Sequence, residues 1–262
     1  MQFTITTPLN KEIIELFCGA AEVTRAFNEL GFKSFTVDKR NRKGKCVPDL
    51  CADILKINAA VFPFKSPGVI WAAVPCDAFS NAAGNYYRDG TGYKESTKYF
   101  NSMLRKTLSL IEEKLAEKES NRHLIYFIEN PRASLRYNKL MIDFLARTSG
   151  TIKECTLGSY GFPTTKPTDI FTNYSALKLR DKLPYGRGAK CAGQSFNNLT
   201  KAQRQSTPYE LGLDIAYQLC NHYWPPKRTS MLNPSNFKHY MEYLQKTTSL
   251  EDRQPAISMQ VI

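Results

Sequence analysis

Two side chains capable of covalent and proton-transfer chemistry each follow a run of apolar residues. Cys76 comes directly after the apolar run 69–75, and Glu129 comes directly after the run 124–128. Such runs are typical of strands buried on both faces of a parallel sheet. Because ligands bind at the carboxyl edge of such a sheet, we expect Cys76 and Glu129 to lie close together there. The thiol can then act as a nucleophile, and a carboxyl whose pKa is raised by partial burial can transfer protons near neutral pH.

Each of these residues also has a purely structural interpretation. A free cysteine is often a small core residue. The sequence Glu129-Asn130-Pro131 could be an ordinary strand exit, because Pro131 disfavours the helical conformation at Asn130 and fixes the turn. The pairing of a cysteine with a carboxyl at the ends of two buried strands favours the catalytic interpretation.

The start of the chain predicts a strand–helix–strand unit with a nucleoside site. A strand at residues 13–17, a turn of small residues and a helix that stops at Gly31 precede a second strand, 32–37, which ends at Asp38. An acid at this place binds ribose hydroxyls in dinucleotide folds. The turn lacks the G-x-G-x-x-G pattern, and Glu22 at the helix start would repel a phosphate. We therefore expect a nucleoside ligand without phosphates, for which a cationic sulfonium group is suitable, or else a Rossmann-like domain of another kind.

Asp53 is a second acid that could face the same crevice. It could accept a hydrogen bond from an adenine amino group. It could equally cap the segment that follows it, which is the commoner role of an isolated Asp.

Two polar stretches could contact a phosphate chain. The loop 81–97 contains Arg88 among glycines and tyrosines, and a loop of this length is often a lid or a binding loop. The stretch 178–204 holds seven basic residues and one acid, with Arg187 and Lys190 in a Gly-Arg-Gly-Ala-Lys segment suited to phosphate contact. Either stretch could instead be a solvated surface loop.

Composition favours a polyanionic partner. The 262 residues carry 36 Lys plus Arg against 24 Asp plus Glu, a net charge of +12, which makes nucleic acid the leading candidate and disfavours an acidic protein or a free sugar. With 42% hydrophobic residues, the chain can fill a core and is not a disordered tail. Seven scattered cysteines fit reduced thiols, and the three histidines lie at no metal-ligand spacing from a cysteine pair, so no metal is expected.

The predicted organisation is one catalytic domain with two additions. Residues 1–173 and 208–224 form the catalytic domain, 174–207 a small segment that contacts DNA, and 225–262 a helix and tail. The start of the chain lacks a basic region followed by an apolar one, and no apolar stretch reaches membrane-spanning length. We expect a monomer in the cytoplasm, associated with DNA.

Motifs occurring in order resemble those of the DNA cytosine-5 methyltransferase family, most closely its compact branch, which phages and mobile elements often encode. The similarity covers roughly residues 11–220. It implies a class I S-adenosylmethionine-dependent methyltransferase fold, S-adenosylmethionine as donor, and a cytosine flipped out of double-stranded DNA. The motifs are Glu15-Leu16-Phe17-Cys18-Gly19, Asp38, Asp53-Ile54-Leu55, Pro75-Cys76-Asp77-Ala78-Phe79-Ser80 and Glu129-Asn130-Pro131-Arg132.

The resemblance assigns a role to each matching residue. Cys76 is implied to attack C6 of cytosine, and Glu129 to hold N3 and the exocyclic amine. In the donor site, Asp38 is implied to bind the ribose and Asp53 the adenine. The other implied donor-site residues are Phe17, Gly19, Ile54 and Pro75, and the residues expected to bind DNA are Arg88, Arg132, Lys166, Arg187 and Lys190.

This sequence also departs from the family pattern. Val74 stands where a second proline is usual, Pro131 where valine is commoner, and Ala21 where a glycine is expected. The arginine-rich segment is reduced to residues 164–168, with Lys166 as its one cation. Three alternatives stay open: an RNA cytosine-5 methyltransferase, a catalytically inactive nucleic-acid-binding relative, and an enzyme of this mechanism that transfers a group other than methyl.

Overall fold

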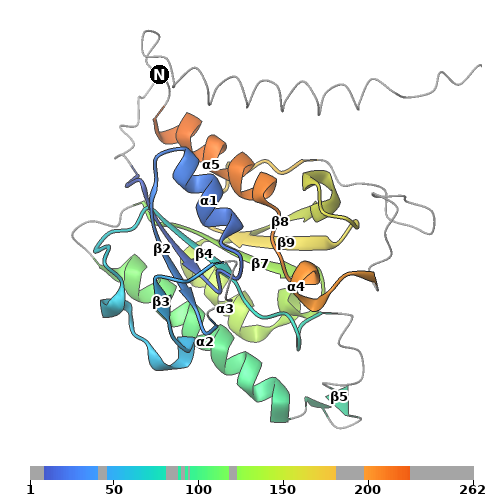
Figure 1. The fold of residues 1–262 in the computed structure, drawn as a ribbon. Helices are drawn as coiled ribbons and strands as arrows, with labels where there is room; N and C mark the ends of the chain where they lie inside the picture. Colours follow the sequence, from blue (N-terminus) through green and yellow to red (C-terminus); the bar gives the residue numbers. More distant parts are fainter. Residues whose placement is uncertain are drawn as a thin grey trace, which may run out of the picture. The chain divides into compact units, whose positions relative to one another are not determined.

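A seven-stranded sheet lies at the centre of the part of the chain that the structure describes (Figure 1). This computed structural model describes residues 9–40, 46–80, 88–89, 92–93, 95–117, 123–180 and 198–224. The strands of the sheet are β1 (Glu12–Leu16), β2 (Lys33–Asp38), β3 (Leu50–Cys51), β4 (Val69–Ala73), β7 (Ile125–Pro131), β8 (Thr151–Thr156) and β9 (Pro167–Thr172). A separate antiparallel pair consists of β5 (Arg88–Asp89) and β6 (Gly92–Tyr93).

The strand order confirms the predicted fold class. Across the sheet the order is β3-β2-β1-β4-β7-β9-β8. Strand β9 is antiparallel to both of its neighbours, whereas the other paired strands are parallel. One reversed strand next to the edge of an otherwise parallel sheet, in this order, is the topology of the class I S-adenosylmethionine-dependent methyltransferase fold.

Helices cover both faces of the sheet (Figure 1). Helices α1 (Glu22–Glu29) and α5 (Tyr209–Tyr223) pack together on one face, and α2 (Glu95–Ala116) and α3 (Lys139–Thr148) lie on the other. Gly212 permits the close approach of α5 to α1, because a Cβ there would lie 3.1 Å from Val23 Cα. The shorter helices are η1 (Ile54–Lys56), η2 (Ala59–Val61), η4 (Ser134–Tyr137), η5 (Leu157–Tyr160) and α4 (Lys201–Arg204).

The two apolar runs form the central strands, with different ends from those expected. Strand β4 ends at Ala73, so Pro75 and Cys76 lie in the loop that follows. Strand β7 continues through Glu129 to Pro131 and does not end at residue 128. The reason is pairing with β9, which places Glu129 opposite Ile170. Pro131 has no backbone N–H to donate to the partner strand. It is tolerated here because it is the last residue of β7.

The strand directions bring five segments to one edge of the sheet. The parallel strands β1, β2, β4 and β7 all have their carboxyl ends there. Because β9 runs the opposite way, its first residues lie at this same edge, and Lys166 directly precedes them. The topology thus gathers the ends of four strands and the start of a fifth.

Part of the predicted organisation lies outside the described residues. Residues 181–197, which are half of the expected DNA-contact segment 174–207, and residues 225–262 belong to this part. The division into a catalytic domain and two additions stays a prediction. In the described ranges, no helix combines the length and the apolar character needed to cross a bilayer.

Candidate active site

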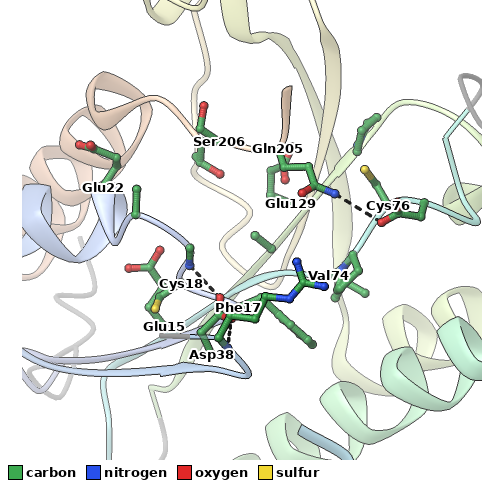
Figure 2. Close-up of a pocket in the computed structure, with 18 of the residues that line it drawn as sticks. Glu15, Phe17, Cys18, Glu22, Asp38, Val74, Cys76, Glu129, Gln205 and Ser206 are labelled. Atoms are coloured by element: carbon green, nitrogen blue, oxygen red, sulfur yellow. Dashed lines mark hydrogen bonds between the residues drawn. The ribbon is translucent and has the colours of Figure 1, made fainter. Parts of the chain in front are cut away.

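A cavity of about 690 Å³ lies at the carboxyl edge of the sheet. Figure 2 shows Glu15, Cys18 and Asp38 on one side of it and Cys76 on the other. The structure brings together nine of the residues predicted from the sequence, all of which line this cavity: Phe17, Gly19, Asp38, Asp53, Ile54, Pro75, Cys76, Glu129 and Lys166. Arg187, Lys190 and the side chain of Arg88 lie outside the described part of the chain.

Cys76 lies in a tight turn after β4. Its carbonyl oxygen accepts hydrogen bonds from the backbone N–H groups of Phe79 (2.9 Å) and Ser80 (2.8 Å), which fix the turn. Burial raises the pKa of the Cys76 thiol to about 11, and the neighbouring Glu129 carboxylate adds to this rise. Cys76 is therefore a thiol at neutral pH, and a nucleophilic attack by it requires the loss of a proton.

Glu129 and its neighbour Asn130 connect β7 to the turn that holds Cys76. Strand pairing places Glu129 beside Ala73, at the end of β4. Asn130 Nδ2 donates a hydrogen bond of 2.9 Å to Val74 O, which ties β7 to the loop that carries Cys76. The Glu129 side chain is buried, and burial raises the pKa of its carboxyl. A protonated carboxyl can donate a hydrogen bond to a ring nitrogen, so the site can supply both a nucleophile and an acid.

Lys166 supplies a buried cation to the same site. Its Nζ lies 3.9 Å from Glu129 Oε1 and 5.2 Å from the centre of the Phe162 ring. Among the described residues, Glu129 Oε1 has no hydrogen-bond partner. The Lys166 charge opposes the effect of burial on both Glu129 and Cys76, because it lowers the pKa of each. Its backbone φ is 30°, an uncommon value for a residue with a side chain.

The loop between β1 and α1 is held in an unusual conformation. Phe17 (φ 60°), Gly19 (φ 56°) and Ala21 (φ 54°) all have left-handed backbone angles, and only one of them is a glycine. The backbone N–H of Gly19 donates a hydrogen bond of 3.0 Å to Asp38 Oδ2, which joins this loop to the end of β2. Strained residues often cluster at ligand-binding sites. The Ala21 seen in the sequence as a departure from glycine therefore sits at a position where glycine would be less strained.

Glu15 is a cavity residue that the sequence reasoning missed as a functional group. It lies in β1, is only 3% exposed, and accepts a hydrogen bond of 2.8 Å from the backbone N–H of Thr24. This bond caps α1, whose N-cap residue, Ala21, has no side-chain acceptor. Burial raises the pKa of Glu15 to about 7. An acid inside an apolar strand was the available signal for it.

Asp53 performs the capping role that was one of its two interpretations. Its Oδ1 accepts a hydrogen bond of 3.1 Å from the backbone N–H of Leu55 in the first turn of η1. Its Oδ2 lies 2.7 Å from Nζ of Lys39. Asp53 also lines the cavity, with Ile54 beside it. The proposed contact with an adenine amino group stays a prediction.

Arg132 lies in a network of ion pairs next to the cavity. Its guanidinium is 3.2 Å from Glu154 and 3.5 Å from the buried Asp169. Arg136 also contacts both acids, with Nη2 at 2.8 Å from Glu154 and 2.6 Å from Asp169. Arg132 is not among the residues that line the cavity. A phosphate bound by Arg132 would have to compete with two carboxylates, and its predicted role in DNA binding stays untested.

The segment before α5 completes the cavity wall. Gln203 and residues 205–208 line it, and Figure 2 shows Gln205 and Ser206 there. Gln205 Nε2 donates a long hydrogen bond of 3.4 Å to Asp77, the residue after Cys76. This segment is far from the other motifs along the chain and has no periodicity, so the sequence predicted no cavity role for it and placed residues 203–207 in the DNA-contact segment and Pro208 at the start of the last catalytic part.

The cavity is acidic although the chain is basic. The chain carries a net charge of +12, whereas most charged side chains that line the cavity are acids. A surplus of carboxylates favours a cationic ligand and disfavours a phosphate-bearing one. Over the residues that the structure describes, no group of three histidine, cysteine or acidic side chains could hold a metal ion. The acids are Glu15, Glu22, Asp38, Asp53, Asp77, Glu129 and Glu210, and the cations are Lys39, Arg40 and Lys166.

Comparison with known proteins finds structural likeness without sequence likeness. No model of a protein family and no curated protein matches the chain. It is similar to a DNMT2 mutant of Spodoptera frugiperda (18% identity, TM-score 0.43), to the methyltransferase EhMeth of Entamoeba histolytica (14%, 0.45) and to the Dnmt2 methyltransferase of S. pombe (12%, 0.40). These matches cover 65%, 65% and 64% of this chain. They cover 53%, 55% and 50% of the other chains, so this chain spans about half of their length.

Proposed function

We propose that this chain transfers a methyl group from S-adenosylmethionine to C5 of cytosine in double-stranded DNA. The observation that carries the proposal is the placement of a cysteine and a buried carboxyl, Cys76 and Glu129, on one cavity at the carboxyl edge of a methyltransferase-type sheet. Cytosine C5 is a poor nucleophile by itself. Covalent attack on C6 by a thiolate replaces one difficult step with two easier ones.

Glu129 and Cys76 act in sequence in the proposed reaction. Protonated Glu129 donates a hydrogen bond to N3 of the flipped cytosine, which draws electrons from the ring and makes C6 electrophilic. The negative charge of ionised Glu129 raises the pKa of Cys76. When Glu129 is protonated this effect is absent, so the Cys76 thiol loses its proton more readily. The thiol gives its proton to water, its sulfur bonds to C6, and the electron pair that gathers at C5 takes the methyl group, with S-adenosylhomocysteine as the product of the donor. Loss of the C5 proton to a water molecule and cleavage of the C6–S bond release the Cys76 thiolate, which takes a proton from water to restore the thiol.

The other half of the cavity fits the proposed donor. When bound, S-adenosylmethionine supplies an electrophilic methyl group on a positively charged sulfur. Asp38, held by the Gly19 N–H, is available for ribose hydroxyls, and Asp53 for the adenine amino group. Ile54 and Phe17 offer apolar contacts, and Pro75, which precedes Cys76 in the chain, also lines the cavity. The surplus of acids suits the cationic sulfonium group.

The choice of DNA as substrate rests on charge and on the resemblance of the motifs. The whole chain has a net charge of +12 although its cavity is acidic, which favours a polyanion at the surface. Structured RNA carries the same phosphate charge, so the two polymers have to be separated by experiment.

The test is transfer of labelled methyl from S-adenosylmethionine to mixed-sequence duplex DNA, with structured RNA offered in parallel and in competition. We expect label at cytosine C5 in DNA, no transfer by Cys76→Ala, and severely slowed transfer by Glu129→Gln. Label in RNA alone would overturn the assignment of DNA and keep the chemistry. Full activity of either variant would refute the mechanism.

A further inference from the structure

Lys39 contacts two other residues that line the cavity, Asp53 and Tyr99. Its Nζ lies 2.7 Å from Asp53 Oδ2 and 3.4 Å from the Tyr99 hydroxyl. The same ammonium lies 5.9 Å from the centre of the Tyr99 ring. All three residues line the cavity and come from different parts of the chain: Lys39 follows β2, Asp53 precedes η1, and Tyr99 belongs to α2. Lys39 therefore joins three elements around the predicted adenine end.

The two oxygens of Asp53 are both engaged. Oδ1 accepts the backbone N–H of Leu55, a bond that caps η1 and is fixed by the chain. Oδ2 accepts from the Lys39 ammonium, and this bond is the main cause that lowers the pKa of Asp53. The oxygen that a ligand can reach without uncapping η1 is therefore the one that Lys39 holds.

We propose that Lys39 competes with the adenine of the donor for Asp53. In the ligand-free protein Lys39 binds Asp53 Oδ2, and it is displaced when the adenine amino group donates a hydrogen bond to that oxygen. The inference rests on the proposed function, in which Asp53 receives that amino group. An ammonium has only donors and an aromatic amine acts as a donor, so the two groups cannot bond to each other. Because a carboxylate oxygen can accept two hydrogen bonds, the competition is for the position next to Asp53 Oδ2, which Lys39 occupies at 2.7 Å.

The exposure of Lys39 makes displacement feasible. Its side chain is 59% exposed, so the ammonium is solvated by water once it leaves Asp53. Exposed ion pairs contribute little to stability, so we expect the loss of this one to change affinity by at most about fivefold. Lys39 is therefore a modest competitor that holds the adenine end together when no ligand is present.

Competition also predicts how Lys39 affects the choice between 6-amino and 6-oxo purine ligands, an effect that a purely structural lysine would not produce. A purine with a 6-oxo group offers an acceptor where adenine offers a donor. Lys39 can stay on Asp53 and use a second N–H to reach that oxygen. The wild-type protein should therefore discriminate weakly between 6-amino and 6-oxo ligands. Removal of Lys39 should favour the 6-amino ligand.

The test measures binding by calorimetry with the full chain. The probes are S-adenosylhomocysteine, which lacks the sulfonium charge, and its 6-oxo analogue S-inosylhomocysteine. Lys39→Met, of similar length and without charge, should bind S-adenosylhomocysteine about threefold more tightly than wild type and S-inosylhomocysteine more weakly. In an Asp53→Asn background, Lys39→Met should give no gain for S-adenosylhomocysteine, because the contested carboxylate is gone.

A second readout follows Lys39 itself. Acetylation by an amine-reactive reagent, measured by mass spectrometry, should be faster at Lys39 when S-adenosylhomocysteine is bound, with the exposed Lys33 of β2 as an internal reference. Weaker binding by Lys39→Met, an equal gain in the Asp53→Asn background, or slower acetylation on binding would each overturn the inference. If neither the wild type nor any variant binds S-adenosylhomocysteine or S-adenosylmethionine, the proposed methyl donor is wrong as well. A failure of the proposed function is thereby distinguished from a failure of the proposed role of Lys39 alone.

Discussion

Replacement of Glu15 by glutamine should remove a pH dependence from the stability of the fold. Burial, the largest effect, raises the pKa of Glu15 from 4.5 to about 7, and the charges of Glu22 and Asp38 add to it. The folded chain therefore holds this proton more tightly than the unfolded chain. As the pH rises from about 4.5 to about 7, the unfolded state loses the proton first, and folding stability falls. A shift of this size corresponds to about 3 kcal/mol, all of it lost once the pH exceeds the folded pKa.

The assay is urea unfolding between pH 4.5 and 8, followed by the fluorescence of the two tryptophans. Glutamine keeps an oxygen that can accept the Thr24 N–H but does not ionise. Relative to wild type, Glu15→Gln should gain about 3 kcal/mol across this range, with most of the change between pH 5 and 7. Glu12→Gln, the same chemical change at the half-buried first residue of β1, controls for the substitution itself. A difference between wild type and Glu15→Gln that is the same at every pH would refute the reasoning.

Three further substitutions test the packing and electrostatics of the site. Gly68→Ala should destabilise the fold by at least about 3 kcal/mol in chemical unfolding, because the new Cβ would meet the backbone carbonyl of Asn10; a loss below 1 kcal/mol would contradict this. Ala21→Gly should stabilise the fold by up to about 1 kcal/mol, since φ is 54° there, and a marked loss in the same assay would be the contrary result. Glu129→Gln should lower the Cys76 pKa below about 11, measured as the midpoint of thiol alkylation against pH; an unchanged midpoint would be inconsistent with the assigned charge effect.

Apolar runs and strand ends were enough to predict that Cys76 and Glu129 lie at the same edge of the sheet, where both line one cavity. Buried parallel strands leave little choice of edge, so Cys76 and Glu129 could be placed side by side from two runs alone. The exact end of β7 could not be predicted, because it depends on β9, an antiparallel partner whose register places Glu129 opposite Ile170. The proximity of Lys166 to Glu129 has the same origin.

Residues whose roles depend on distant partners were harder to predict. Arg132 was counted as a cation for DNA, but the structure places it against Glu154 of β8 and Asp169 of β9. Gln205 reaches Asp77 from 128 positions away. Pairings of this kind follow from tertiary packing and leave no local pattern in the sequence.

The central claim is that Cys76 forms a covalent bond with a cytosine that receives a methyl group. The most direct test mixes the full chain, S-adenosylmethionine and duplex DNA containing 5-fluorocytosine, followed by denaturing gels and mass spectrometry. Fluorine cannot leave C5 as a proton does, so the covalent complex accumulates. We expect an adduct that maps to Cys76 and carries one added methyl group, and none with Cys76→Ala. An adduct at another residue, or no adduct with either DNA or RNA, would contradict the proposed reaction.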